Sequence, residues 1–260
     1  MLKISPPQNQ NMELHKHPQH VTHKKKWGEY LLEFLMLFLA VTLGFFAENI
    51  RENYKDHEKA RVYAAQMISN LCDDTLNLKS FISLLNAGAG KGDTLLQLLT
   101  DSNPQKVSGK LYFYGLIGGR DFNFIPNDAT LLQMKSSGTL RYFNMRISHD
   151  VAQYEQFCRR LEIAQDRDQG LFVEVRKIRA QIFNVSYNDF VNKHYHVSPM
   201  IDSFVRTNPP LLTYDKSILN QYVELVRSRF VLLRTPKTAD TLLRRATDLI
   251  RDLKREYNIK

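Results

Sequence analysis

A glycine-rich stretch with one lysine, NAGAGKGDT at residues 86–94, is the first place where the sequence suggests a binding site. Such a loop cradles phosphates when Ser or Thr follows the lysine and another glycine stands five residues before Gly90. In this chain Gly92 follows Lys91, and Leu85 occupies the earlier position. The stretch also follows a helical pattern and not a strand. We therefore expect the glycines to end a helix and to bind no nucleotide.

Two histidines stand two residues apart in the stretch KHYHVS, at His194 and His196. On a strand they would share one face and bind a metal together with a third ligand such as Asp189. No further ligand cluster is visible, so we interpret both as polar loop residues. Four more histidines lie in the N-terminal segment, where a tail without a folded frame binds metal weakly and unselectively: His15, His17, His20 and His23.

Two other clusters contain residue types used in catalysis, but at unsuitable spacing. Residues 148–150 read SHD, and consecutive residues on a helix point in different directions, so they do not form a catalytic triad. Residues 166–170 read DRDQG and lack the later acid of a calcium loop. We interpret them as a solvated helix face. The sequence thus predicts no enzyme, no cofactor, and no catalytic, cofactor-binding or metal-ligating residue.

Composition indicates a folded, helix-rich chain with a basic surface. The 260 residues include only 11 glycines and 9 prolines, so little interrupts long helices. The net charge of +9 would suit lipid headgroups or nucleic acid, but basic and acidic residues are interleaved, which is typical of solubility charge. We expect no nucleic-acid partner.

The chain has two cysteines, which are too few for a disulfide scaffold. We favour two buried free thiols, while a Cys72–Cys158 disulfide stays open as the alternative.

The elements that would position any site begin with an apolar run from Tyr30 to Ile50. Its only charged residues are Glu33 and Glu48, and Thr42 is the one polar residue between positions 34 and 47. As a helix the run is about 30 Å long, which matches the hydrocarbon core of a bilayer. A soluble core helix would keep a polar face. The run therefore predicts a transmembrane helix in contact with the lipid bilayer.

A cleaved signal peptide and a soluble core helix are the alternatives for this run. No small-x-small cleavage site follows it, because Phe45 stands at the −3 position before Ala47. Residues 1–29 read as a disordered basic tail. Four Lys or Arg residues lie within about twenty positions on either side of the run, and the three consecutive lysines at 24–26 favour the N-terminus inside and the body outside.

Apolar periodicity predicts that the membrane helix continues as a long stalk helix up to the glycines at 86–92. Residues 106–126 are ambiguous between an extended segment and a short helix, and residues 185–213 read as a loop. Further helices are expected at 94–100, 127–135 (closed by Gly138), 144–183 (with a kink at Gly170), 215–233 and 239–257. This pattern predicts an all-α antiparallel bundle over residues 51–260.

Two small residues, Ala40 and Gly44, stand four positions apart in the predicted span. On a helix they share one face and permit close approach of a second helix. The sequence therefore predicts a homodimer contact through Ala40 and Gly44.

The chain resembles a family of uncharacterised bacterial single-pass membrane proteins, a domain of unknown function. Three segments are similar: Gly28-Glu29 and Glu48-Asn49 around the span, FIPNDATLLQMKSSGTLRYF at 124–143, and ATDLIRDLKREYNI at 246–259. One departure is that the tryptophan that many relatives have just after the span is missing here. The resemblance implies a helical extracytoplasmic domain on one N-terminal anchor, and it implies no activity, ligand or catalytic residue.

These features together predict a scaffold or partner-binding protein of the bacterial cell envelope. We expect it in the inner membrane, with a cytoplasmic N-terminus, a periplasmic body and an unidentified protein partner. A ligand-sensing helical bundle that acts through a partner is the first alternative. A membrane-associated enzyme of unidentified chemistry is the second alternative.

Overall fold

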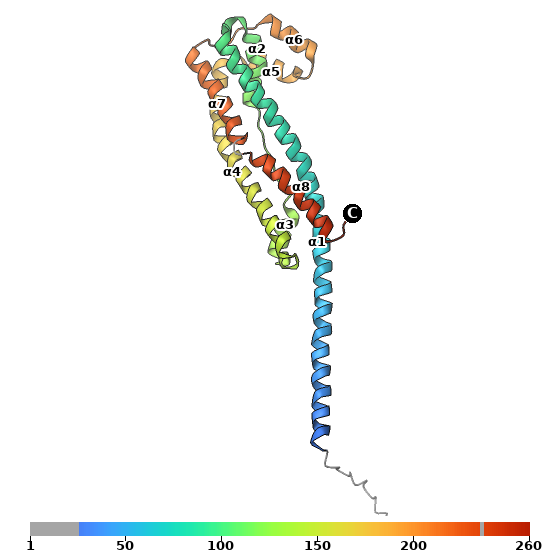
Figure 1. The fold of residues 1–260 in the computed structure, drawn as a ribbon. Coiled ribbons are helices and arrows are strands. Elements are labelled where there is room, and N and C mark those ends of the chain that lie inside the picture. Colours follow the sequence, from blue (N-terminus) through green and yellow to red (C-terminus); the bar gives the residue numbers. More distant parts are fainter. Residues whose placement is uncertain (1–25, 235–236) are drawn as a thin grey trace, which may run out of the picture. The chain divides into compact units, whose positions relative to one another are not determined.

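The computed structural model describes residues 26–234 and 237–260. Their regular elements are helices, with no strand among them, so the all-α prediction is confirmed (Figure 1). The chain divides inside helix α1 (Trp27–Asp101) into two units, residues 1–53 and 54–260. Most of the predicted disordered tail, including its four histidines, lies outside the described residues. Residues 27–29 do not belong to that tail, because α1 already includes them.

In the first unit, α1 is the one helix of the described chain that is long and apolar enough to cross a membrane. None of its side chains between Trp27 and Asn53 is buried. The hydroxyl of Thr42 donates to the carbonyl oxygens of Phe38 at 2.8 Å and Leu39 at 3.1 Å. Because these bonds lie within the helix, the polar side chain needs no partner from a surrounding apolar medium.

The second unit contains the rest of α1 and seven further α-helices in the described residues. Their bounds are α2 (Ser108–Gly115), α3 (Ala129–Ser136), α4 (Met145–Ile182), α5 (Val185–His194), α6 (Ser198–Thr207), α7 (Lys216–Arg234) and α8 (Thr238–Glu256). Three 3-10 turns complete the list: η1 (Pro104–Lys106), η2 (Leu116–Gly119) and η3 (Thr139–Tyr142).

Helix α4 is the central contact element of the second unit, because it packs along both α7 and α8. Within this unit the body part of α1 and α4 run in one direction, whereas α7 and α8 follow each other in the opposite direction (Figure 1). The two closing helices both pack on α4 and touch each other little. Helix α4 is thus antiparallel to α7 and α8, whereas α1 and α4 are parallel to each other.

Several predicted boundaries agree with the structure. Helix α4 starts at Met145, where the Asn144 side chain accepts a hydrogen bond from the Ile147 amide at 2.8 Å and so caps the helix. The short helix α3 is followed by Gly138, whose φ of 69° is the left-handed geometry expected after a helix. Helices α7 and α8 lie within one residue of their predicted limits.

The glycine stretch 86–92 does not end the stalk helix, so that prediction was wrong. Helix α1 continues through it to Asp101 and absorbs the helix expected at 94–100. Gly88 lies against the ring of Phe230, and a Cβ there would overlap that ring. Gly92 faces Val226 and Arg227. The glycines thus allow α7 to approach α1 closely, and the tertiary contact offsets their low helix propensity.

The expected loop at 185–213 is also wrong, because it contains α5 and α6. Tyr112 of α2 holds both ends of this region: its hydroxyl donates to the Pro210 carbonyl at 3.0 Å and accepts from the Asn184 amide at 3.0 Å. The ring of Tyr112 meets Phe183 and Phe204 edge to face. The ambiguous residues 106–126 resolve into α2, η2 and an extended segment.

Candidate functional site

A fully buried ion pair joins Arg229 of α7 to Asp168 of α4. Both side chains are 1% exposed. Arg229 Nε donates to Asp168 Oδ1 at 2.8 Å, and Nη2 donates to Oδ2 at 2.6 Å. This parallel two-bond geometry is the strongest form of an arginine–carboxylate contact.

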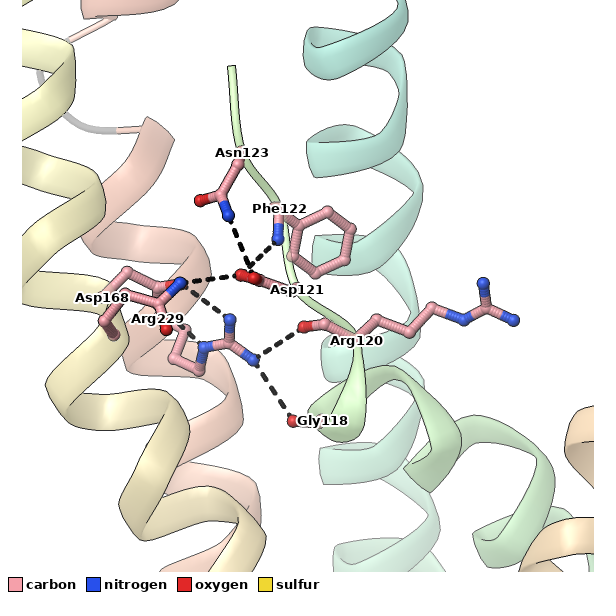
Figure 2. Close-up of polar contacts among 8 residues, drawn as sticks. Gly118, Arg120, Asp121, Phe122, Asn123, Asp168 and Arg229 are labelled. Atoms are coloured by element: carbon pink, nitrogen blue, oxygen red, sulfur yellow. Dashed lines mark hydrogen bonds and ion pairs between the residues drawn. The ribbon is translucent and has the colours of Figure 1, made fainter. Parts of the chain in front are cut away.

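The same guanidinium also holds the segment that follows η2 (Figure 2). Arg229 Nη1 donates to the carbonyl oxygens of Gly118 at 3.2 Å and Arg120 at 3.0 Å. Next to it, Asp121 accepts hydrogen bonds from the Gln169 amide group at 2.9 Å and from the Asn123 amide group at 3.0 Å. One arginine thus joins α4, α7 and an extended segment whose backbone has no helix or sheet partner.

The cluster around Asp168 and Arg229 holds the backbone of residues 118–120 in place and offers no reactive group to solvent. Phe172 lies under the guanidinium at 4.6 Å from the ring centre, and Phe122 lies at 6.0 Å. Such a pair stabilises one arrangement of the helices, because removing either partner leaves a buried charge uncompensated. The prediction that residues 166–170 form a solvated face was wrong at Asp168.

A second buried polar cluster lies where α1 and α4 meet the extended segment. Asp74 of α1 is 1% exposed and accepts hydrogen bonds from the Tyr154 hydroxyl at 2.5 Å and the Asn127 amide at 2.8 Å. Burial raises the pKa of the Asp74 carboxyl, and these two hydrogen bonds oppose the rise. Gln165 of α4 clamps Phe124 through both backbone groups, at 2.6 Å and 3.1 Å.

A cavity of about 310 Å³ opens beside this second cluster. Tyr154 and Cys158 of α4 contribute to its wall, together with apolar side chains of α1 and of the segment 124–132. Apolar cavities with a few fixed polar groups are the usual form of small-molecule sites, and this volume lies at their lower limit. The cavity is lined by Met67, Asn70, Leu71, Phe124, Ile125, Pro126, Asn127, Asp128, Thr130, Leu131, Leu132, Tyr154, Glu155, Cys158, Arg159, Glu162 and Gln165.

Two titratable groups of the cavity wall, Cys158 and Tyr154, favour their neutral forms. Burial raises the pKa of the Cys158 thiol to about 12, so little thiolate exists near neutral pH. Burial also raises the pKa of Tyr154, and the neighbouring Cys158 and Asp74 add to that effect. A nucleophile or general base requires the opposite shift, so this arrangement suits binding better than acid–base chemistry.

The sequence candidates for metal and triad chemistry do not converge. His194 ends α5, where its Nδ1 lies 2.9 Å from the Phe190 carbonyl oxygen, and His196 lies in the following turn and not on a strand. Ser148 donates to the Leu140 carbonyl, whereas His149 contacts Gln153 one helical turn later. Among the described residues, no group of three or more His, Cys, Asp or Glu is placed to hold a metal ion.

Both cysteines are free, so the disulfide alternative is excluded. Cys72 is exposed on α1, and Cys158 is half-buried at the cavity. The expectation of two buried thiols is therefore wrong for Cys72.

Sequence reasoning missed all three buried charges, although a signal was present. In α7, Arg229 occupies the same face as the buried residues Val226 and Leu233, at spacings of three and four. Asp168 stands seven residues from both Leu161 and Val175, which are buried in α4. A charge at a core position of one helix and an opposite charge at a core position of another predict a buried pair.

Comparison with known proteins adds no family to this geometry. No protein-family model matches the chain, and searches of curated proteins and of solved structures returned no match. The resemblance to a bacterial membrane protein family therefore stays a prediction.

Proposed function

We propose that this chain is a single-pass membrane-anchored binding protein of the bacterial cell envelope. In this proposal residues 30–50 span the inner membrane, the N-terminus is cytoplasmic, and the helical body binds a protein partner or acts as a scaffold in the periplasm. The observation that carries the proposal is the apolar part of α1, which has the length of a bilayer and no buried side chain.

The internal bonding of this segment supports the same proposal. The hydroxyl of Thr42 is satisfied within its own helix, as a lipid environment requires. The second unit has its own core, including Leu71, Ile147 and Val226, and does not depend on the apolar run for burial. An unburied apolar helix next to a self-sufficient core is typical of an anchor.

Anchoring and orientation are tested on membranes from cells that express the full chain. We expect the protein to stay in the pellet after alkaline carbonate extraction. Protease added to spheroplasts should then digest residues 51–260 and leave an N-terminal fragment. Complete protection of the body in intact spheroplasts, with digestion after lysis, would reverse the proposed orientation.

Self-association through the span is part of this proposal. Ala40 and Gly44 share one helix face, and no atom lies within 4 Å of a Cβ built at Gly44. Replacing Gly44 with Leu should weaken cross-linking between copies in membranes, whereas the same change at Thr42, on the opposite face, should not. Equal cross-linking in both variants would remove this contact from the proposal.

Ligand sensing is the second candidate, and the 310 Å³ cavity favours it. A Leu131→Trp substitution places a larger ring in the cavity wall, and a Leu84→Trp substitution on the exposed face of α1 is the control. We expect a small molecule to co-purify with the wild-type chain and with the control, but not with Leu131→Trp, when extracts are compared by mass spectrometry. Identical extracts from all three proteins would argue against a ligand in this cavity.

A further inference from the structure

A different part of the second unit gathers positive charge around one aromatic ring. The Lys91 ammonium of α1 lies 4.5 Å from the ring centre of Tyr195, and the guanidinium carbon of Arg120 lies 4.7 Å from it. Figure 2 shows that the Arg120 side chain points away from Arg229, so it takes no part in the buried ion pair. Two cations from distant parts of the sequence thus meet at Tyr195.

No carboxylate compensates these charges within residues 26–234 and 237–260. Neither Lys91 nor Arg120 forms an ion pair there, although 24% of the whole chain is charged. The nearby acids are engaged elsewhere, since Asp93 pairs with Arg227 and Asp121 accepts from Gln169 and Asn123.

The local environment only partly offsets the positive charge. The Tyr195 ring attracts both cations, and the carboxyl-terminal end of α5 adds a partial negative charge. Burial nevertheless lowers the pKa of Lys91, and the charge of Arg120 lowers it further. An anion placed between the two cations would raise the pKa of Lys91 and so oppose both effects.

We propose that Lys91 and Arg120 form a binding site for a phosphoryl anion. A doubly charged phosphoryl group matches two adjacent cations in charge, and the arginine fork binds two of its oxygens at once. The group belongs either to a soluble phosphate or to a phospholipid headgroup. This site goes beyond the proposed membrane anchoring and does not depend on it.

The test uses the full-length chain in a neutral detergent and measures acetylation of individual lysines by mass spectrometry. The reagent is the uncharged N-hydroxysuccinimide ester of acetic acid, so that it does not compete for an anion site. Inorganic phosphate is compared with chloride at equal ionic strength. In a second arm, vesicles containing phosphatidylglycerol are compared with vesicles of phosphatidylcholine alone.

We expect phosphate to slow acetylation of Lys91 several-fold and to leave Lys79, which is exposed on the same helix, unchanged. Protection by phosphatidylglycerol alone would assign the phosphoryl group to a lipid. Arg120→Gln should abolish the protection, whereas Arg251→Gln, a change to an exposed arginine, should preserve it. The proposal is overturned if Lys91 is protected in neither arm, if Lys79 is protected equally, or if Arg120→Gln behaves like the wild type.

Discussion

Loss of Arg229 should strongly destabilise the body. Replacing it with Met keeps its length but leaves the Asp168 carboxylate buried without a partner. Breaking a buried ion pair in this way costs about 3–5 kcal/mol. We expect a loss of this size in the free energy of unfolding, measured by circular dichroism in denaturant.

An exposed ion pair provides the matched control for Arg229. Arg251 pairs with Asp248 at 2.9 Å, but its side chain is 66% exposed. The substitution Arg251→Met should therefore cost less than about 1 kcal/mol. If Arg251→Met and Arg229→Met destabilise equally, burial of the Asp168–Arg229 pair is not what gives it importance.

The raised pKa of Asp74 makes the stability of the body depend on pH. Burial raises its pKa above the ordinary 3.8, so the folded state binds a proton more tightly than the unfolded state. The contribution of Asp74 to stability is thus greatest at low pH and declines as the pH rises from 3.8 through the raised pKa. The variant Asp74→Asn, which carries no titrating proton, should lack this decline.

The measurement for Asp74 is the melting temperature of both proteins between about pH 3 and pH 7. The difference between wild type and Asp74→Asn should change between pH 3.8 and the raised pKa of Asp74 and stay constant at higher pH. A difference that is constant over the whole range would show that Asp74 titrates alike in the folded and unfolded chain.

At the scale of elements, the close contact between α1 and α7 depends on one glycine. A Cβ at Gly88 would overlap the Phe230 ring, whereas no atom lies within 4 Å of a Cβ at Gly90. We expect Gly88→Ala to destabilise the body by about 1–3 kcal/mol through overpacking. Gly90→Ala should stabilise it by about 0.5–1 kcal/mol, because alanine favours the helix.

Gly88 and Gly90 separate two roles of the stretch 86–92, which are close approach to α7 and helix propensity. Thermal unfolding of Gly88→Ala and Gly90→Ala shows whether each substitution raises or lowers the stability of the body. If Gly88→Ala also stabilised the protein, the stretch would act only through helix propensity, and close approach to α7 would not explain its glycines.

At the scale of the whole molecule, the two units imply that the anchor can be removed without loss of the body. We expect a chain lacking residues 28–50 to be soluble without detergent and to give a helical circular dichroism spectrum, because the core lies in residues 54–260. A soluble product with a mostly β spectrum, or a product that stays insoluble, would contradict this expectation.

The sequence by itself determined the all-α class, the bilayer-length apolar segment and the limits of α4, α7 and α8. These features depend on composition and on local periodicity, and both can be read directly from the amino-acid sequence. The end of α3 at Gly138 was predictable for the same reason, since it depends on an interaction within a few residues.

Only the tertiary structure decided the elements and sites that depend on distant partners. Gly88 remains helical because α7 packs on it, and α5 and α6 are anchored by Tyr112 more than seventy residues away. Asp168 and Arg229 are 61 residues apart, and Lys91 and Tyr195 lie farther apart still. Burial and charge pairing are properties of packed neighbours, so no local pattern specifies which residues meet.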